Sequence, residues 1–259
     1  MLDRIRLDGR VAIVTGAAGV IGIATMQLLA ARGARIVAVD RLQWDVQAAI
    51  ADLPASAEAH AVRADVTRED EVAGYVRAAT DKFGTIDVFC NNAGVEGEIT
   101  PIAKYPLEAF RHVIDVNVVG VFLGLKHVLP VMLKQDKGSI INTASIAGLI
   151  GSPDIAAYTA SKHAVIGLTK SAAIECTGTG VRVNCVCPGL IDSRMLSAII
   201  DGRNSGKAPV PAEKIVERIP ARRLGQPSEV ASLVAFLASD EASYVSGSAY
   251  TVDGGRIAS

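Results

Sequence analysis

The chain has 259 residues, half of them hydrophobic, and its formal net charge at neutral pH is −1. That length and composition suffice for one domain with a large buried core. A nearly neutral chain with 4% aromatic residues lacks the charge and the stacking surfaces that nucleic-acid-binding proteins use, and it has no electrostatic attraction to an anionic membrane. The segment Met1–Arg10 is charged and has no apolar run, unlike a secretory signal. Four cysteines are too few for a disulfide scaffold, so we expect a cytoplasmic protein with reduced thiols.

Short β-branched runs alternate with longer segments of helical pattern along the chain. The predicted strands are Val11–Thr15, Arg35–Asp40, His60–Ala64, Ile86–Cys90, Ser139–Thr143, Val181–Val186 and Ala249–Val252. The predicted helices are Val20–Arg32, Gln43–Asp52, Arg68–Phe83, Pro106–Lys134, Ala157–Cys176 and Pro227–Ser239. Strands that alternate with helices pair in parallel and are covered on both faces. We therefore predict an α/β fold, a three-layer Rossmann-type doubly wound parallel sheet of about seven strands with helices on both faces.

Neither an internal repeat nor a linker divides the sequence, so 1–259 is expected to form a single domain. Only the segment Ile191–Ala221 departs from the strand–helix rhythm. It looks like an insertion after the sixth strand, and Gly202 and Gly206 near its centre make it a candidate lid over a substrate. The most apolar stretch, Val113–Leu133, is interrupted by polar and charged residues, which predicts a buried helix rather than a membrane span.

A glycine-rich turn follows the first predicted strand and leads directly into a helix. Gly16, Gly19 and Gly22 permit a tight turn, a close approach of the backbone to a pyrophosphate, and close packing of helix on strand. The start of the helix, with Val20 and Ile21, supplies amide donors and a partial positive charge. In this context the loop predicts a dinucleotide site, which makes the single domain both the cofactor-binding and the catalytic unit.

The residue at the end of the second strand indicates which dinucleotide is bound. A carboxylate such as Asp40 accepts hydrogen bonds from the adenosine ribose and repels the 2′-phosphate of NADP. Arg41 offers a guanidinium that accepts such a phosphate, but we give Asp40 the deciding weight and expect NAD. Residues after the third and fourth strands lie at the same edge and are either cofactor contacts or ordinary turn residues. They are Asp65, Val66, Asn92, Ala93 and Gly94.

Tyr158 and Lys162 are four residues apart on a predicted helix, so their side chains share one face. Transfer of a hydride from an alcohol requires a base for the hydroxyl proton, and reduction of a ketone requires the same group as an acid. A free phenol titrates at about pH 10. An ammonium beside it, together with the charge of oxidised nicotinamide, would stabilise the phenolate and lower that pKa. Ser145, just past the fifth strand, is placed to hold the substrate oxygen.

Taken together these motifs resemble the short-chain dehydrogenase/reductase family, and the resemblance covers 7–255. They occur in the family's order: the glycine loop, Asp65-Val66, Asn91-Asn92-Ala93-Gly94, Asn117, Ser145, Tyr158-Thr159-Ala160-Ser161-Lys162 and Pro188-Gly189. One motif departs from the shorter, single-domain branch, whose middle glycine falls at position 20, which is Val20 here. The spacing of Gly16, Gly19 and Gly22 is that of the extended branch, which includes epimerases and dehydratases. Because the chain lacks that branch's extra domain, we retain the shorter branch and expect an altered pyrophosphate loop.

The resemblance implies further roles. Asn117 would bind a water that connects Lys162 to solvent, although a buried amide satisfied within the core is the alternative. Lys162 would also bridge the hydroxyls of the nicotinamide ribose. The segment after the sixth strand would bind the nicotinamide carboxamide through its backbone, and a serine there would keep a contact commonly made by threonine. Its residues are Pro188, Gly189, Ile191 and Ser193.

The residues expected to border the nicotinamide pocket are mostly apolar. They are Val95, Glu96, Ile146, Ile155, Leu190, Met195, Leu196 and Ile199. Arg194 and Arg203 in the insertion are expected to be solvated rather than to bind substrate. Such a pocket suits an uncharged, hydrophobic secondary alcohol or its ketone, cyclic or aryl-substituted. Glu96 could bond a second oxygen, so a diol or hydroxyketone is the second choice.

The sequence thus predicts an NAD-dependent alcohol dehydrogenase or ketone reductase whose partner is a small alcohol or ketone. Two alternatives stay open: a non-catalytic nucleotide-sensing or scaffold protein on the same fold, and an epimerase or dehydratase that retains NAD. No metal is expected, because the four histidines form no set with ligand spacing. The apolar helices Pro106–Lys134 and Ala157–Cys176, which relatives pair across a twofold axis, predict a homotetramer.

Overall fold

Seven strands rich in β-branched residues form the centre of the fold. They are β1 (Val11–Thr15), β2 (Arg35–Asp40), β3 (Ala59–Arg63), β4 (Val88–Asn91), β5 (Gly138–Thr143), β6 (Val181–Pro188) and β7 (Ala249–Val252). They pair in the order β3-β2-β1-β4-β5-β6-β7, and every pairing is parallel. The computed structural model describes residues 5–41, 43–204 and 212–258. Gly206, a predicted lid glycine, lies outside them.

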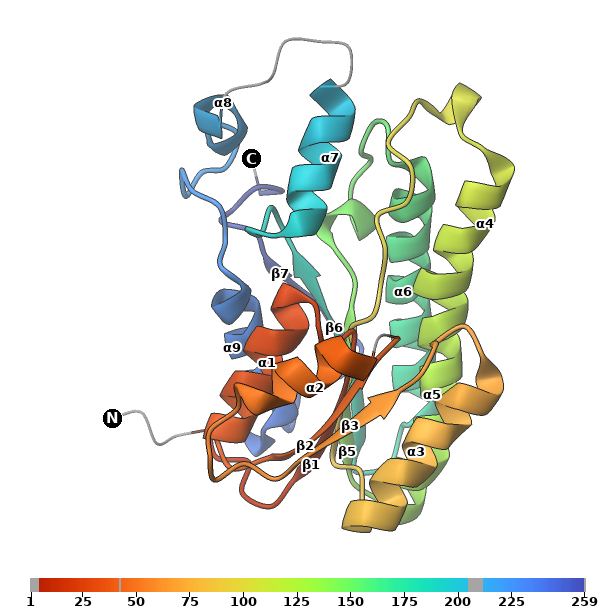
Figure 1. Cartoon of the computed structure of the whole chain (residues 1–259), viewed down its shortest axis with the longest axis vertical. Helices are drawn as coiled ribbons and strands as arrows, with labels where there is room; N and C mark the ends of the chain where they lie inside the picture. Colours follow the sequence, from red (N-terminus) through yellow and green to blue (C-terminus); the bar gives the residue numbers. More distant parts are fainter. Residues whose placement is uncertain (1–4, 42, 205–211, 259) are drawn as a thin grey trace.

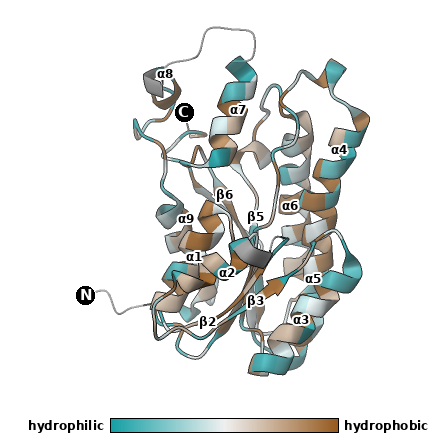
Figure 2. Ribbon diagram, viewed as in Figure 1, coloured by the Kyte–Doolittle hydropathy of each residue, from teal (hydrophilic) through white to brown (hydrophobic). Residues whose placement is uncertain are grey.

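Helices cover both faces of this sheet (Figure 1). On one face lie α1 (Val20–Ala31), α2 (Gln43–Ala51) and α9 (Pro227–Ala238), and on the other α3 (Glu69–Phe83), α4 (Leu107–Ile114), α5 (Gly120–Gln135) and α6 (Ala156–Glu175). Each face has its own buried apolar cluster between sheet and helices. In Figure 2 hydrophobic colour is concentrated on the strands and on the helix sides turned toward them. The predicted three-layer α/β fold is confirmed.

Several element boundaries differ from the sequence prediction. The fourth strand begins at Val88 rather than Ile86, where the Ile86 amide instead donates to the side chain of Gln135. The predicted helix Pro106–Lys134 is interrupted by a π-helical turn, η2 (Asp115–Val119). Three short 3₁₀ turns were not predicted: η1 (Ile102–Lys104), η3 (Ile146–Gly148) and η4 (Asp240–Ala242).

The described part of the insertion, 191–204 and 212–221, contains two helices, α7 (Arg194–Asn204) and α8 (Ala212–Val216), which stand above the carboxyl ends of the strands (Figure 1). Gly202 lies inside α7, where a Cβ would come within 2.7 Å of Ile99, so it serves close packing rather than a hinge. Ser193 caps the N-terminus of α7, since its Oγ accepts a hydrogen bond from the Leu196 amide at 3.1 Å.

The helical run Leu107–Gln135 is long and apolar enough to cross a membrane by length and composition alone. In the fold, however, Val121, Leu125 and Val128 are buried in the core cluster between this run and the sheet. The run is therefore a core helix of the domain. The four cysteines of the chain are all free and buried.

Candidate active site

One large pocket lies at the carboxyl edge of the sheet, beneath α7, with a volume of about 1080 Å³. It opens where the strand order reverses between β1 and β4, the place at which such sheets bind ligands. All predicted cofactor residues line it except Gly22, and so do Ser145, Tyr158 and Lys162. Asn117 does not line it.

The glycine loop forms the floor at one end of the pocket. Gly16 has a φ of 63°, and a Cβ there would lie 2.9 Å from the Cα of Ala93. A Cβ on Gly22 would lie 2.2 Å from the Gly16 carbonyl, so this buried glycine permits the loop to pack on α1. Gly19 is the N-cap of α1, and Val20 is 42% exposed at the pocket wall. The backbone amides at this helix start are thus open to a phosphate.

The Asp40 carboxylate is fixed beside that loop. Its Oδ2 accepts a hydrogen bond from the Ala18 amide at 3.0 Å, and its Oδ1 accepts one from the Arg41 amide at 2.7 Å. Each oxygen keeps a lone pair for a further donor. The Arg41 side chain is exposed. A fixed carboxylate next to a glycine loop has the chemistry that an adenosine ribose requires, so the residues present fit the adenosine end of a nicotinamide dinucleotide.

The side chain of Asn92, which follows β4, lines the pocket and also forms hydrogen bonds to neighbouring strands. Its Nδ2 donates to the carbonyls of Thr15 and Gly16, and its Oδ1 accepts from the Thr143 hydroxyl at 3.1 Å. The Thr15 hydroxyl in turn accepts hydrogen bonds from the amides of Asn92 and Ala93. This network holds the glycine loop against β4. Neither threonine was predicted, because the spacing of a motif along the chain does not show contacts between strands.

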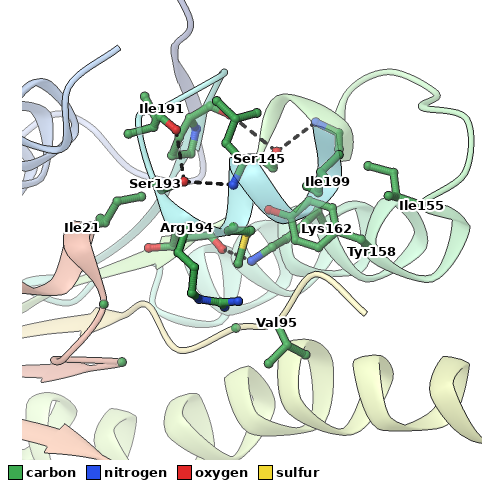
Figure 3. Close-up of a pocket in the computed structure, with 18 of the residues that line it drawn as sticks. Ile21, Val95, Ser145, Ile155, Tyr158, Lys162, Ile191, Ser193, Arg194 and Ile199 are labelled. Carbon is green, nitrogen blue, oxygen red and sulfur yellow. Dashed lines mark hydrogen bonds between the residues drawn. The ribbon is translucent and has the colours of Figure 1, made fainter. Parts of the chain in front are cut away.

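Ser145 and Tyr158 lie on the same side of the pocket (Figure 3). The Ser145 Oγ accepts a hydrogen bond from the Ala147 amide at 3.1 Å and lies 3.5 Å from the Pro188 carbonyl. Burial raises the pKa of Tyr158 to about 12, although the Ser145 hydroxyl acts in the opposite direction. The sequence had led us to expect a lowered pKa. The side chains of the chain by themselves do not lower it, because desolvation of the phenol and the nearby Glu96 carboxylate both raise the pKa and outweigh the Ser145 hydroxyl.

Lys162 is buried one helical turn from Tyr158. Its Nζ donates to the Thr143 carbonyl at 2.8 Å and lies 5.5 Å from the centre of the Tyr158 ring. Burial lowers the pKa of this ammonium to about 8. The hydrogen bond thus anchors the lysine to the end of β5 and places its ammonium group next to the Tyr158 phenol.

Asn117 lies in the π-helical turn η2 and is fully buried. Its Nδ2 donates to the Val95 carbonyl and the Ser161 hydroxyl, and its Oδ1 accepts from the Val95 amide at 2.8 Å. Ser161 then donates to the Tyr158 carbonyl at 2.7 Å. Only one lone pair of Oδ1 remains for a water. The structure therefore shows Asn117 joining the loop after β4 to helix α6.

The segment after β6 closes the pocket from above. The Ser193 hydroxyl donates to the Ile191 carbonyl at 3.1 Å and also caps α7, so it has already one donor and one acceptor contact within the chain. Gly189 packs against Asp253 of the C-terminal segment, where a Cβ would come within 2.7 Å of the Asp253 Cα.

The apolar residues predicted for substrate binding line the pocket, and several surround the Tyr158 ring. Ala147 and Ile155 form a buried cluster with Tyr158, and Met195 and Ile199 of α7 pack against it. The other predicted lining residues are Val95, Ile146, Leu190 and Leu196.

Glu96 does not line the pocket, contrary to the prediction: its side chain is only 12% exposed, and its carboxylate pairs with Arg194 at 3.0 Å. Arg194 is 78% exposed, as expected, although it also lines the pocket (Figure 3). Arg203 is half-buried and lines the pocket, so the expectation of a solvated side chain was wrong for it. Lining residues that the sequence analysis missed include Ile150, Ser152, Pro153, Ile200, Lys214, Ile215 and Arg218. The apolar residues Met195 and Ile199 are four positions apart, and this helical spacing was the pattern from which α7 could have been predicted.

Comparisons with known proteins identify the family to which the chain belongs. A family model described as enoyl-(acyl carrier protein) reductase matches residues 16–256. The chain is 39% identical to levodione reductase of Leifsonia aquatica, over 98% of this chain and 96% of that protein. The chain belongs to the short-chain dehydrogenase/reductase family. The Val20 variant of the glycine loop thus occurs in a member of that family.

Two further relatives bear on the reaction. Cyclohexanol dehydrogenase of Acinetobacter sp. (strain SE19) is 39% identical over 96% of this chain and 95% of its own length. The crystal structure of NAD⁺-bound xylitol dehydrogenase superposes with a TM-score of 0.93 at 37% identity, covering 96% of this chain and 99% of that one. This family member is an oxidoreductase that acts on CH–OH groups. This reaction class replaces the two alternatives that the sequence left open, a non-catalytic scaffold protein and an epimerase or dehydratase.

Proposed function

We propose that the protein interconverts a hydrophobic secondary alcohol, cyclic or aryl-substituted, and its ketone with NAD(H), and that Tyr158 is the acid and base. The observation that carries this proposal is the placement of one buried phenol between Ser145 and Lys162, at an apolar wall and next to the glycine loop. A hydride acceptor, an acid/base and a water-poor pocket are what alcohol oxidation requires.

The choice of NAD rests on Asp40. Its carboxylate is fixed by two backbone amides at the place where the adenosine ribose of a dinucleotide would bind, and it would repel the 2′-phosphate of NADP. The NAD⁺-bound relative supports this choice. Bound NAD⁺ would accept the hydride from the carbinol carbon.

The remaining steps fall to the side chains. Ser145 would hold the substrate hydroxyl, and Tyr158 would take its proton during oxidation and return one during reduction. Burial holds the pKa of Tyr158 at about 12, so the phenol is neutral at pH 7 and suited to act as the acid. Lys162, held by the Thr143 carbonyl, would stabilise the phenolate formed in the other direction.

The apolar wall supports a hydrophobic substrate. Ile155, Met195 and Ile199 would contact the carbon skeleton beside the reacting carbon. The relatives named for cyclohexanol and for levodione favour a cyclic alcohol or ketone. A diol held by Glu96 is less well supported, because that carboxylate is paired with Arg194.

We further infer that the insertion, whose helix α7 lines the pocket, closes over bound substrate. We also infer that the protein is a cytoplasmic homotetramer. Phe122 on α5 is 48% exposed and Ile174 on α6 is 75% exposed, so both long helices carry apolar side chains on their outer faces. Closed assemblies commonly bury such faces against a second copy.

The direct test is a panel of secondary alcohols and their ketones, including cyclohexanol and cyclohexanone, assayed with NAD(H) and with NADP(H) at the absorbance of reduced nicotinamide. We expect stoichiometric formation of NADH from cyclic alcohols. Turnover without net change in NADH, or no turnover with any member of the panel, would contradict the proposal.

A further inference from the structure

The far end of the pocket is basic. Arg203, at the end of α7, and Lys214 and Arg218, on and after α8, all line the same pocket as Tyr158. Among the side chains that the structure describes, no carboxylate forms an ion pair with any of the three. Among the described residues, the acidic ones that line the pocket lie at the end of β2, just after β3 and at the start of η2, namely Asp40, Asp65 and Asp115.

Arg203 is held in place by the chain. Its Nη2 donates to the Ser152 hydroxyl at 2.9 Å and to the Pro153 carbonyl at 2.8 Å, while its Nε is buried without a partner in the described residues. The hydroxyl of Ser152 accepts from Arg203, so its hydrogen is free to donate to another acceptor. Burial lowers the pKa of Arg203, the nearby Arg218 lowers it further, and Asp154 opposes them. Because the two guanidinium groups line one pocket and repel each other, an anion bound in that part of the pocket would stabilise both.

The basic end continues the wall that surrounds Tyr158. Met195, Ile199 and Arg203 follow one another at intervals of four residues and therefore share one face of α7. The first two pack on the Tyr158 cluster. With a rise of about 1.5 Å per residue, Arg203 stands roughly 6 Å beyond Ile199 and 12 Å beyond Met195 along the helix axis. Figure 2 shows α7 hydrophobic in its middle and hydrophilic at its C-terminal end.

We propose that Arg203 and Arg218, with Lys214 and the Ser152 hydroxyl, bind a carboxylate that the substrate carries on the far side of its apolar body from the reacting carbon. The inference rests on the proposed function, since it deepens the substrate class of that site. It replaces the uncharged substrate expected from the sequence with an apolar ring that bears an anionic group. The ring lies against Ile155 and Ile199, and the carboxylate lies at the end of α7.

The test compares matched pairs of ketones that differ only in charge. The pairs are 4-oxocyclohexanecarboxylate with its carboxamide, and 3-(4-oxocyclohexyl)propanoate with its propanamide. We expect kcat/KM of wild-type enzyme to favour the acid at least tenfold in one pair. Arg203→Gln should remove that preference while changing kcat/KM for the amide less than threefold. Arg222→Gln is the matched control, because Arg222 directly follows the insertion and lies outside the pocket lining.

A merely structural role of Arg203 would lower kcat/KM for acid and amide equally, and that outcome overturns the proposal. A second measurement, the Kd of NADH, tests the other source of an oxyanion, the cofactor pyrophosphate. If Arg203→Gln weakens NADH more than tenfold and leaves the acid preference intact, the basic end serves the cofactor and the proposal is wrong.

The proposed reaction and the proposed anion site can be refuted separately. Turnover of the amides and of cyclohexanone without preference for the acids would leave the proposed function standing and refute the anion site. If no ketone reacts, the proposed function fails, and titration of the acids into the enzyme–NADH complex by calorimetry decides the anion site. Binding of an acid that is lost in Arg203→Gln supports it, and absence of binding overturns it.

Discussion

Asp40 is the residue on which the cofactor prediction depends. Its carboxylate is fixed by the amides of Ala18 and Arg41, so a 2′-phosphate would meet an immobile negative charge. We expect kcat/KM for NAD⁺ to exceed that for NADP⁺ at least tenfold, about 1.4 kcal/mol. Asp40→Ala should narrow the ratio mainly through KM for NADP⁺. Asp45→Ala, an exposed carboxylate on α2, is the control and should leave the ratio unchanged. Equal efficiency of the wild type with both cofactors would show that Asp40 does not discriminate.

Asn117 satisfies the Val95 amide and carbonyl and the Ser161 hydroxyl at once. Asn117→Ala leaves these groups without their partner, so we expect a loss of unfolding free energy of about 1–3 kcal/mol. Urea denaturation measures it. Because Ser161 is bonded to the Tyr158 carbonyl, kcat should fall as well. A variant as stable as the wild type would mean that water replaces the amide at no cost.

Residues that follow from spacing along one element could be predicted to line the pocket. The glycines of the loop and the pair Tyr158 and Lys162 belong to this class, and all but the buried Gly22 line the pocket. The residues missed act across elements. Thr143 anchors Lys162 through a backbone carbonyl, and Arg203 reaches the loop at Ser152, which is 51 positions away. Pairings at that separation are set by the packing of the sheet and are not visible in local periodicity.

At the scale of elements, α9 offers a test of pH dependence. Glu229 accepts hydrogen bonds from Arg223 and from the Gln226 amide, and the Arg223 side chain is the main cause that lowers the pKa of Glu229 from 4.5 to about 2. A carboxyl whose folded pKa lies below its unfolded pKa stabilises the fold above the unfolded value, and that contribution is lost as pH falls through the folded value.

We therefore expect Glu229→Gln to lower Tm at neutral pH and to differ less from the wild type as the pH falls from 4.5 toward 2. Differential scanning calorimetry across this window measures the effect. The glutamine side chain of the variant keeps an oxygen that can accept the hydrogen bond from the Gln226 backbone amide. The comparison therefore measures the effect of removing the negative charge. A Tm difference that does not change with pH would contradict the account.

The prediction of elements succeeded where one signal dominated. Continuous β-branched runs located all seven strands within two residues at their starts, because both faces of a parallel strand are buried. The π-helical turn at Asp115–Val119 was missed because its apolar pattern is also that of an α-helix. Helix α7 was missed because the insertion has glycines and polar residues, and its helix is supported by packing of Gly202 against Ile99.

At the scale of the whole molecule, the outer faces of α5 and α6 predict assembly. Phe122→Glu would place a charge on a face that we expect to be buried between copies, so it should convert the tetramer to smaller species. Light scattering at micromolar concentration measures the mass. Tyr244→Glu, at a fully exposed side chain outside these helices, is the control. A wild-type monomer would refute the prediction of a tetramer.

We propose that a single buried phenol, Tyr158, carries out the proton transfer in a nicotinamide-linked oxidation. The most direct measurement is kcat of Tyr158→Phe with a cyclic secondary alcohol and NAD⁺, alongside NADH affinity by fluorescence titration. Removing the hydroxyl should lower kcat by about 10²–10⁴ and leave the Kd of NADH within threefold of the wild type, as Tyr244→Phe should in both measurements. If Tyr158→Phe keeps more than a tenth of wild-type kcat while binding NADH normally, another group transfers the proton and the account of the site is wrong.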